Sequence, residues 1–346
     1  MSTTGTDFGS LAAPFRKELL AYCYRMTGSI HDAEDLVQET YLRGWRSYPG
    51  FEGRSSLRTW LYRIATNACL KALRQAGRRA LPSGLGQPGG DPDASVPSAH
   101  AAVSWLRPIP DALFVDESAD PAMVATSRDG MRLAFVAALQ YLTPRQRTVL
   151  ILRDVLRWRA VEVADLLDTT ASAVDSVLRR ARDRLAQVAP TVDSVVEPAD
   201  PRRRRLLDRY VAAFAEVDVA ALTALLAEDA VWEMPPNPVW FAGRDAVGEL
   251  LAARMSGGRG DNRLVRTAAN GQPALAVYAR GADDVHRAHS VQVLTVAAGG
   301  ITRVVAFHDP GLFAAFGLPR VLAPDGFPAV AGSVPATGAG PDGRYA

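Results

Sequence analysis

Cysteine is scarce in this 346-residue chain, where Cys23 and Cys69 are the two present and both have apolar neighbours. Two cysteines make a poor disulfide framework, so we expect buried free thiols in a reducing compartment. Long hydrophobic runs are missing too, because no stretch approaches the ~20 apolar residues of a membrane span and no basic-then-apolar leader begins the sequence. These absences argue against secreted and membrane-spanning classes and predict a cytoplasmic protein.

An excess of charge of either sign is also absent. The chain has 39 basic and 37 acidic residues, a net charge of +2, although 22% of its residues are charged. Any contact with nucleic acid must therefore come from local clusters of basic residues. No Cys and His residues have the spacing of a metal site, and no glycine-rich phosphate loop follows a predicted strand. We predict neither a metal nor a cofactor.

The chain is too long for one ordinary hydrophobic core, and its patterning divides it into several units. Two helical segments flank a linker rich in proline and glycine, and a third unit follows that mixes helices with alternating strands. The linker contains WLRPIPDALFVDESADPA, which is apolar enough that we expect it to dock on a domain. The predicted units are 10–80 (helical), 81–127 (linker, with the docking segment 105–122), 128–190 (helical), 204–328 (α+β) and 329–346 (disordered tail).

The first motif is the acidic segment DAEDLVQETYLRGW, which reads as a helix. Val37, Tyr41 and Trp45 recur every four residues and form one apolar stripe. Acidic side chains occupy much of the remaining surface, and DNA would repel them, so this helix predicts a basic protein partner. The candidate partner-binding residues are Asp32, Glu34, Asp35, Gln38 and Glu39.

A helix expected near residues 57–74, capped by Ser55 or Ser56, carries a basic stripe beside its apolar face. The loop before it and the helix itself also supply flat side chains. Aromatic stacking together with phosphate contacts by cations is what holds an unpaired nucleic-acid strand. The candidate contacts are Phe51, Arg54, Trp60, Tyr62, Arg63, Asn67, Lys71 and Arg74.

A helix-turn-helix is expected further along the chain. Thr143 and Pro144 can begin its supporting helix as cap and first residue, and the final helix begins at Ala171. A second helix of this kind places its N-terminal half in the major groove, where arginine reads guanine or binds phosphate. The candidate DNA contacts are Thr170, Ser172, Asp175, Ser176, Arg179 and Arg180.

In this order, the three motifs resemble the sigma-70 family of bacterial sigma factors, in the extracytoplasmic-function (ECF) group. The resemblance covers about residues 10–80 and 130–190. It implies that the acidic helix binds core RNA polymerase, that the basic helix and its loop hold melted bases of the −10 element, and that the helix-turn-helix reads the −35 element of promoter DNA. The linker is longer than the short connector usual in the group, and the chain continues past the second DNA-binding unit.

The last unit is expected to begin with one amphipathic helix over 206–226, to have another helix near 244–255, and to include strands at 274–280, 291–297 and 301–307. Gly299 and Gly300 predict a hairpin between the last two strands. This order resembles the SnoaL-like or nuclear-transport-factor-2-like (NTF2-like) cone, which occurs in a subset of ECF sigma factors and implies regulation in cis. The linker motif WLRPIPD resembles the same subset. The candidate pocket for an unknown small ligand is formed by Trp232, Met234, Trp240, Phe241, His289, His308 and Asp309.

Two other interpretations stay open from the residues. One is a stand-alone helix-turn-helix regulator that does not bind polymerase. The other is a cyclase or hydrolase of the cone fold tethered to DNA-binding helices, with His289 or Asp309 as the acid-base group. No spacing among the pocket residues defines a reaction, so we predict a sigma factor that is not an enzyme, whose activity is tuned by its C-terminal domain.

Overall fold

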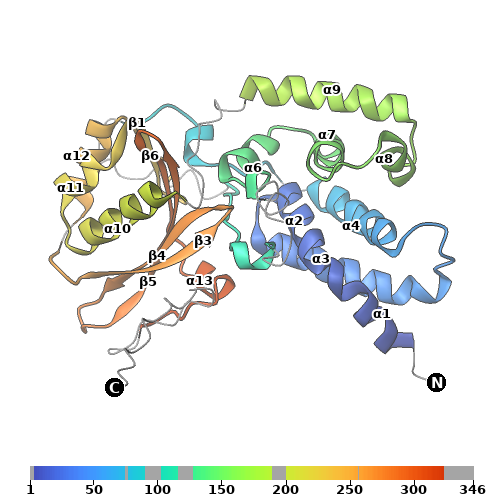
Figure 1. Ribbon diagram of the computed structural model, residues 1–346, viewed down its shortest axis with the longest axis horizontal. Helices are drawn as coiled ribbons and strands as arrows, with labels where there is room; N and C mark the ends of the chain where they lie inside the picture. The colour runs from blue at the N-terminus through green and yellow to red at the C-terminus, as the bar shows by residue number, and fades with distance from the viewer. Residues whose placement is uncertain are drawn as a thin grey trace, which may run out of the picture.

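The computed structural model describes residues 4–74, 77–89, 103–115, 128–188, 200–255 and 257–322. These residues form a helical half and a second half built on one sheet (Figure 1). The arrangement confirms the predicted architecture of two all-α units and a C-terminal α+β unit. The predicted tail and linker residues 90–102 and 116–127 lie outside the described residues.

The first helical unit has one core shared by its helices, which are α1 (Thr4–Ala12), α2 (Arg16–Thr27), α3 (Ile30–Ser47) and α4 (Leu57–Leu73). Ser29 caps α3 and Ser56 caps α4, each accepting a hydrogen bond from a backbone N–H of the following turn. Cys23 and Cys69 are fully buried, with their Sγ atoms 3.8 Å apart. The hydrogen bond with Cys23, together with burial, raises the pKa of the Cys69 thiol, which keeps Cys69 protonated and unreactive.

The second helical unit contains the predicted helix-turn-helix. Its helices are α6 (Leu133–Leu139), α7 (Pro144–Leu150), α8 (Ala160–Leu166) and α9 (Ala171–Val188). Thr143 caps α7 in a reciprocal capping box with Gln146, and Pro144 is the first helical residue, as predicted. The turn between α8 and α9 contains Asp168 in the left-handed region, with φ of 49°. α9 therefore packs across α7 and α8, as the second helix of such a motif does.

The C-terminal unit is a six-stranded sheet in the order β2-β1-β6-β5-β4-β3. The strands are β1 (Leu226–Glu233), β2 (Trp240–Ala242), β3 (Asn262–Ala269), β4 (Gln272–Arg280), β5 (His286–Ala297) and β6 (Gly300–Phe307). The three predicted strands lie within β4, β5 and β6, and the predicted hairpin joins β5 to β6 through the pair Ala297 and Gly300. β1 pairs in parallel with β6, which joins β1 and β2 to the four antiparallel strands of the sheet.

The prediction of one helix over 206–226 was wrong. The structure has α10 (Pro201–Ala215) and α11 (Val219–Ala224), and Leu226 already belongs to β1. The break falls at Val217, which adopts φ of 57° and cannot continue a right-handed helix. Together with α12 (Arg244–Arg254), these helices cover one face of the sheet (Figure 1).

The two faces of the sheet have different partners because side chains alternate along each strand. One face, with Leu294 and Val304, packs against α10, α11 and α12. The opposite face, with Val293 and Val305, belongs to the same buried apolar cluster as the cores of both helical units. The C-terminal unit is thus joined to the helical half through hydrophobic contacts.

The linker crosses this junction in two described segments, 77–89 and 103–115. They pair with each other at Ala80, whose carbonyl accepts a hydrogen bond from Leu106 N at 3.0 Å. Leu106 and Ile109 are fully buried. Gly28 ends α2 with φ of 71°, and a Cβ added there would lie 2.5 Å from a side-chain carbon of Leu106. The described part of the predicted docking segment therefore packs tightly against the first helical unit.

Candidate functional site

Two of the predicted partner-binding residues of α3 form ion pairs within the chain. Asp32 pairs with Arg79 of the linker at 2.5 Å, and Glu39 pairs with Arg43 one turn further along α3. Asp32 therefore anchors the linker as well as lying on the predicted partner surface. The remaining predicted residues are half-buried or exposed: Glu34, Asp35 and Gln38.

Two large apolar side chains lie beside these groups on the surface of α3. Leu42 is 55% exposed and Trp45 is 52% exposed. Trp45 is the exposed end of the apolar stripe that begins at the buried Val37, because each step of four residues turns about 40° on a helix and two steps move the side chain about 80°. Leu42 and Trp45 border a groove of about 590 Å³ that Phe8 and Tyr41 also line. The spacing of Gln38, Leu42 and Trp45 was the signal for this exposed face.

The predicted nucleic-acid surface of the first unit contains an aromatic cluster at the start of α4. The ring of Phe51 lies 4.9 Å from that of Trp60 and 6.1 Å from that of Tyr48. Arg54 in the loop is exposed and pairs with Glu52 at 3.1 Å. Three more predicted contacts are exposed along α4: Asn67, Lys71 and Arg74.

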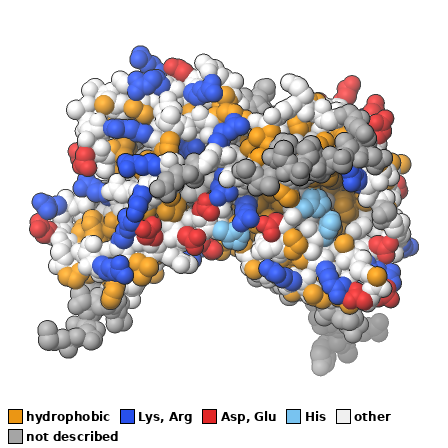
Figure 2. All heavy atoms as spheres, turned by 180° about the vertical axis from the view of Figure 1, so that it is seen from behind, with side chains coloured by type: hydrophobic (Ala, Val, Ile, Leu, Met, Phe, Trp, Pro, Cys, Tyr) orange, Lys and Arg blue, Asp and Glu red, His pale blue; other side chains and the backbone are white. Residues whose placement is uncertain are grey.

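A groove of about 300 Å³ lies next to this cluster, between α3 and α4. Trp60 and Asn67 line it, together with Arg43 and Arg46, which the sequence interpretation missed. Their signal was the placement of two arginines in the last turns of the acidic helix. Basic side chains lie along the half of the molecule that contains the helical units (Figure 2). The groove combines cations with an aromatic wall, as binding of an unpaired strand requires.

Tyr62 and Arg63 are placed differently from the prediction. Tyr62 is fully buried between Tyr22 and Trp158, so it does not present its ring to a nucleic-acid strand in this structure. The helical spacing of residues in the sequence did not reveal the burial of Tyr62, because the second helical unit covers that side of α4. Arg63 is exposed, yet its Nη2 donates to the backbone oxygen of Asp165 in α8 at 2.7 Å.

The predicted DNA-reading residues of α9 extend from its start to its middle. Thr170 begins the helix, since its Oγ1 accepts a hydrogen bond from Ala173 N at 3.2 Å. Arg179 and Arg180 are exposed, whereas Asp175 lies 3.9 Å from Arg153. The two other predicted contacts are on the same side of the helix: Ser172 (exposed) and Ser176 (half-buried).

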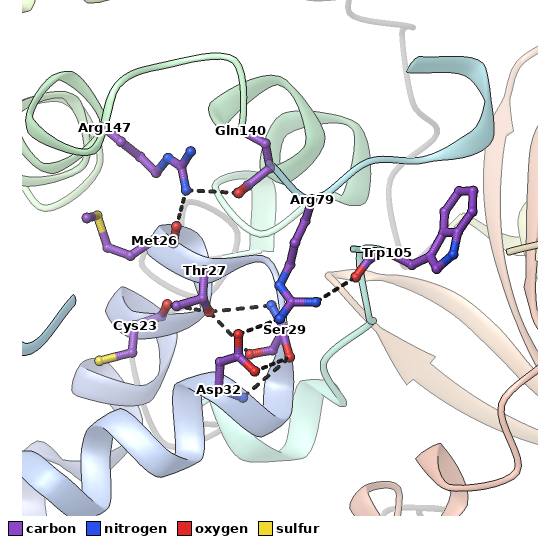
Figure 3. A network of polar contacts seen from close by, with 9 residues as sticks. All are labelled: Cys23, Met26, Thr27, Ser29, Asp32, Arg79, Trp105, Gln140 and Arg147. Carbon is purple, nitrogen blue, oxygen red and sulfur yellow. Dashed lines mark hydrogen bonds and ion pairs between the residues drawn. The ribbon is translucent and has the colours of Figure 1, made fainter. Parts of the chain in front are cut away.

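The two helical units contact each other directly through buried polar groups. The Arg147 guanidinium of α7 donates to the backbone oxygen of Met26 and to Gln140 Oε1 (Figure 3). Burial lowers the pKa of Arg147 to about 10, so it stays charged at neutral pH. The Trp158 ring packs at a tilt against the Tyr62 ring, with the ring centres 5.1 Å apart, and Arg58 lies over both rings. The −10 candidate helix α4 is thus held against the −35 candidate unit.

The seven candidate pocket residues do not share one pocket. Trp232 and Phe241 face α10, α11 and α12 in the core of the cone, with Met234 packed at its edge. Trp240 lies on the opposite face of the sheet, where its Nε1 donates to Gly86 O of the linker at 3.0 Å. The prediction failed because neighbouring residues of a strand point to opposite faces.

The two histidines pack against each other at the far end of the sheet. The rings of His289 and His308 are 4.9 Å apart at nearly right angles. Burial lowers both pKa values, that of His308 to about 4, with the charge of His289 contributing, so both rings are neutral at pH 7. Asp309, the residue after His308, pairs with Arg107 of the linker at 3.4 Å. Figure 2 shows a hollow with apolar walls beside histidine side chains in this unit.

The turn between β3 and β4 carries a polar contact that the sequence interpretation missed. Asn270 is fully buried with φ of 58°, and its Nδ2 donates to Tyr24 Oη and to Met131 O, both at 2.8 Å. Its Oδ1 accepts from Ile109 N at 3.1 Å. One side chain therefore joins the first unit, the linker and the start of the second unit to the sheet. The Asn-Gly turn signal was present in the sequence, but nothing in it located the turn at this junction.

The next residues of the turn extend the same contact. Gly271 N donates to Asp111 Oδ1 of the linker at 2.8 Å, and Gln272 Oε1 accepts from Leu133 N at 3.0 Å. Burial raises the pKa of Asp111 to about 6, although Gly271 N and Arg128 act in the opposite direction. The junction is held by specific hydrogen bonds as well as by apolar packing.

Within the described ranges, no three His, Cys, Asp or Glu side chains are grouped as a metal site would need. No helix in the same ranges is long and apolar enough to cross a membrane.

Comparison with known proteins assigns each half of this arrangement. Residues 11–79 match the Sigma-70 region 2 model, residues 132–185 the Sigma-70 region 4 model, and residues 207–304 the SnoaL-like domain. The ECF RNA polymerase sigma factor SigG of Mycobacterium tuberculosis (strain ATCC 25618 / H37Rv) is 51% identical over 318 residues, which are 91% of this chain and 85% of the relative. The chain belongs to the ECF sigma factors.

One further relative, known from both its sequence and its crystal structure, carries the same family name. SigJ of M. tuberculosis (strain ATCC 25618 / H37Rv), also an ECF RNA polymerase sigma factor, is 30% identical over 223 residues, covering 64% of this chain and 63% of SigJ. The crystal structure of M. tuberculosis SigJ superposes with a TM-score of 0.60 at 23% identity, covering 90% of this chain and 99% of that one. The fold of this ECF sigma factor is therefore that of SigJ. The match to SigG and to the two Sigma-70 region models confirms its predicted function as a sigma factor.

Proposed function

We propose that this ECF sigma factor binds core RNA polymerase through one face of α3. Asp35 and Gln38 are exposed there next to the large apolar side chains of Leu42 and Trp45. An exposed tryptophan and leucine beside a groove, on a helix that also carries exposed carboxylates, are typical of a protein interface with a basic partner. Asp32, Glu34 and Glu39 flank this face, with Asp32 also holding the linker through Arg79.

Promoter DNA binds two separate surfaces in this proposal. The groove between α3 and α4, with Trp60 and Asn67, receives the unpaired strand at the −10 element, and Phe51, Arg54, Lys71 and Arg74 extend its stacking and phosphate contacts. The N-terminal half of α9, up to Arg179 and Arg180, reads the −35 element in the major groove.

The arrangement described here cannot engage both elements at once. Elements named for positions 35 and 10 are 25 base pairs apart, which is about 85 Å at ~3.4 Å per base pair. The two DNA-binding units are instead in contact, with Arg63 of α4 hydrogen-bonded to Asp165 of α8. They must separate before the protein can use a promoter, so the compact form is the inactive one.

The C-terminal domain holds the units together, and Asn270 is the observation that carries this proposal. Its side chain bonds to Tyr24 in the first unit, Ile109 in the linker and Met131 before α6. Buried hydrogen bonds of this kind leave several unsatisfied groups when they break. Transcription with core polymerase, compared between wild type and an Asn270 variant, tests the proposal.

Arg179→Ala should weaken promoter use by about 1–3 kcal/mol if Arg179 reads a base, and the loss should be selective for the sequence at one position of the −35 element. Electrophoretic mobility shifts on a panel of single-base variants measure this. Arg205→Ala is the matched control, because Arg205 is an exposed arginine of α10 away from α9. An equal loss on every sequence would contradict base reading and mark a phosphate contact.

Asp111→Asn should change how stability depends on pH. In the docked linker the Asp111 pKa is raised from 3.8 to about 6, so the docked form binds the proton more tightly. This contribution is fully present below pH 3.8 and is lost as pH rises through 6. The variant keeps an oxygen for Gly271 N and stays neutral, so it should gain about 3 kcal/mol relative to wild type between pH 4 and pH 7.5.

Urea unfolding of both proteins across this pH range measures the difference, in which the titration of all shared groups cancels. A difference that stays constant with pH would show that the pKa of Asp111 is the same in the docked and unfolded states.

A further inference from the structure

A cavity of about 300 Å³ lies where the linker, the second helical unit and the C-terminal sheet meet. Its walls come from residues 78–84, from α6, from Val188 at the end of α9 and from Arg303 of β6. None of the motifs assigned to polymerase or promoter binding lines it. It is also separate from the core of the cone, because Arg303 and Glu233 lie on the face of the sheet opposite Trp232.

The polar lining of this junction cavity is cationic. Arg78, Arg79 and Arg303 line it, together with Ser83 and Tyr141, and none of its lining residues is acidic. The charges of two of these arginines are partly neutralised by carboxylates that do not line the cavity, because Arg79 pairs with Asp32 and Arg303 pairs with Glu233.

Arg78 has no carboxylate partner among the described residues. Its guanidinium lies 4.1 Å from the centre of the Tyr141 ring, and its Nη2 donates to Gly84 O at 3.1 Å. These contacts orient the side chain but leave its charge uncompensated. The cavity therefore carries a net positive potential, which favours an anion.

The remaining wall is small and apolar. Ala134, Ala137 and Ala138 of α6 leave space where larger side chains would fill the junction. The volume is at the lower end of the range of small-molecule sites, so a nucleotide cofactor is too large. The guanidinium groups of arginine can donate two hydrogen bonds to the oxygens of a phosphate or carboxylate. The alanine wall can accommodate the rest of a ligand if that part is small and apolar or planar.

We propose that the junction cavity binds a small metabolite that carries a phosphate or carboxylate group. Because its walls belong to the linker, the second unit and the sheet, the complete site exists only in the compact arrangement. A ligand at about 100 times its dissociation constant would then favour that arrangement about 100-fold. This regulatory step rests on the proposed inactivity of the compact form, whereas binding itself does not.

Isothermal titration calorimetry of the full-length protein tests the site with three probes: phenyl phosphate, benzoate and uncharged phenol. We expect saturable binding of phenyl phosphate or benzoate, the preferred probe identifying the head group, and none of phenol. Arg78→Gln should weaken binding at least tenfold, and Ala137→Leu should abolish it by filling the cavity. Arg204→Gln, which removes an exposed arginine of α10 outside the cavity, should bind as wild type does.

Absence of saturable binding at low-millimolar probe would overturn the site, and so would equal binding by wild type, Arg78→Gln and Ala137→Leu. A native circular dichroism spectrum of each variant establishes that it is folded. The regulatory step has its own readout, since Asn270→Gly should weaken probe binding by the factor by which it lowers the population of the compact form. If Asn270→Gly leaves transcription unchanged while phenyl phosphate still binds wild type, the compact form is not inhibitory. The proposal that the junction cavity binds an anion would still hold.

Discussion

Full-length protein carrying Asn270→Gly should open at the junction between the C-terminal domain and the helical units. Glycine tolerates the φ of 58° at this position, so the variant removes the side chain without backbone strain. Three hydrogen bonds are lost, and Ile109 N and Met131 O lose their side-chain partner in a buried site. At about 1–3 kcal/mol for each of these two unsatisfied buried groups, the open form should gain at least about 30-fold in population.

Native-state hydrogen exchange measures this opening directly. The amides of Ile109, Gly271 and Leu133 each donate across the junction, so they should exchange faster in the variant by the same factor. Asp284→Gly is the matched control, because Asp284 also has a positive φ, of 61°, in a turn of the same domain but is exposed away from the junction. Unchanged exchange at all three amides in Asn270→Gly would show that this residue does not hold the junction.

Reversing the charge on the polymerase-binding face should eliminate binding to core RNA polymerase. In the Asp35→Arg and Glu39→Arg double variant, two carboxylates of α3 become cations that face a basic partner. Like charges placed against each other at an interface cost several kcal/mol, so the dissociation constant should rise at least about 100-fold. Asp35 has no ion-pair partner among the described residues, and Glu39 pairs with Arg43 on the surface, so the fold should persist.

Co-purification with core polymerase and fluorescence anisotropy measure this loss. Glu249→Arg reverses an exposed carboxylate on α12, far from α3, and should leave polymerase binding unchanged. Trp45→Ala should also weaken binding, since the exposed ring lies on the same face. Binding of the double variant with wild-type affinity would contradict the assignment of this face.

Sequence patterns were sufficient to predict the elements that depend on interactions between residues close in the sequence. The caps Ser56 and Thr143, the helix-turn-helix and the β5–β6 hairpin depend on neighbouring residues, and the structure has each where it was predicted. The single helix predicted over 206–226 failed because hydrophobic periodicity does not reveal a left-handed residue such as Val217.

Contacts between units were beyond the sequence patterns. Tyr62 has the spacing of a surface aromatic, yet Trp158 from a segment nearly a hundred residues later covers it. Asn270 reads as an ordinary turn residue, and its burial follows only from the docking of the linker and the helical units around it. The candidate pocket of the cone failed for a related reason, since Trp240 and Trp232 point to opposite faces of the sheet.

In-vitro transcription with purified core RNA polymerase tests the central claim most directly, comparing full-length wild type with Asn270→Gly on promoter fragments that the protein itself selects. If the C-terminal domain inhibits by holding the DNA-binding units together, the variant should produce at least tenfold more transcript at limiting protein, and Asp284→Gly should match wild type. Equal or fewer transcripts from Asn270→Gly, measured while its junction amides exchange faster, would contradict the claim that the compact form is inactive.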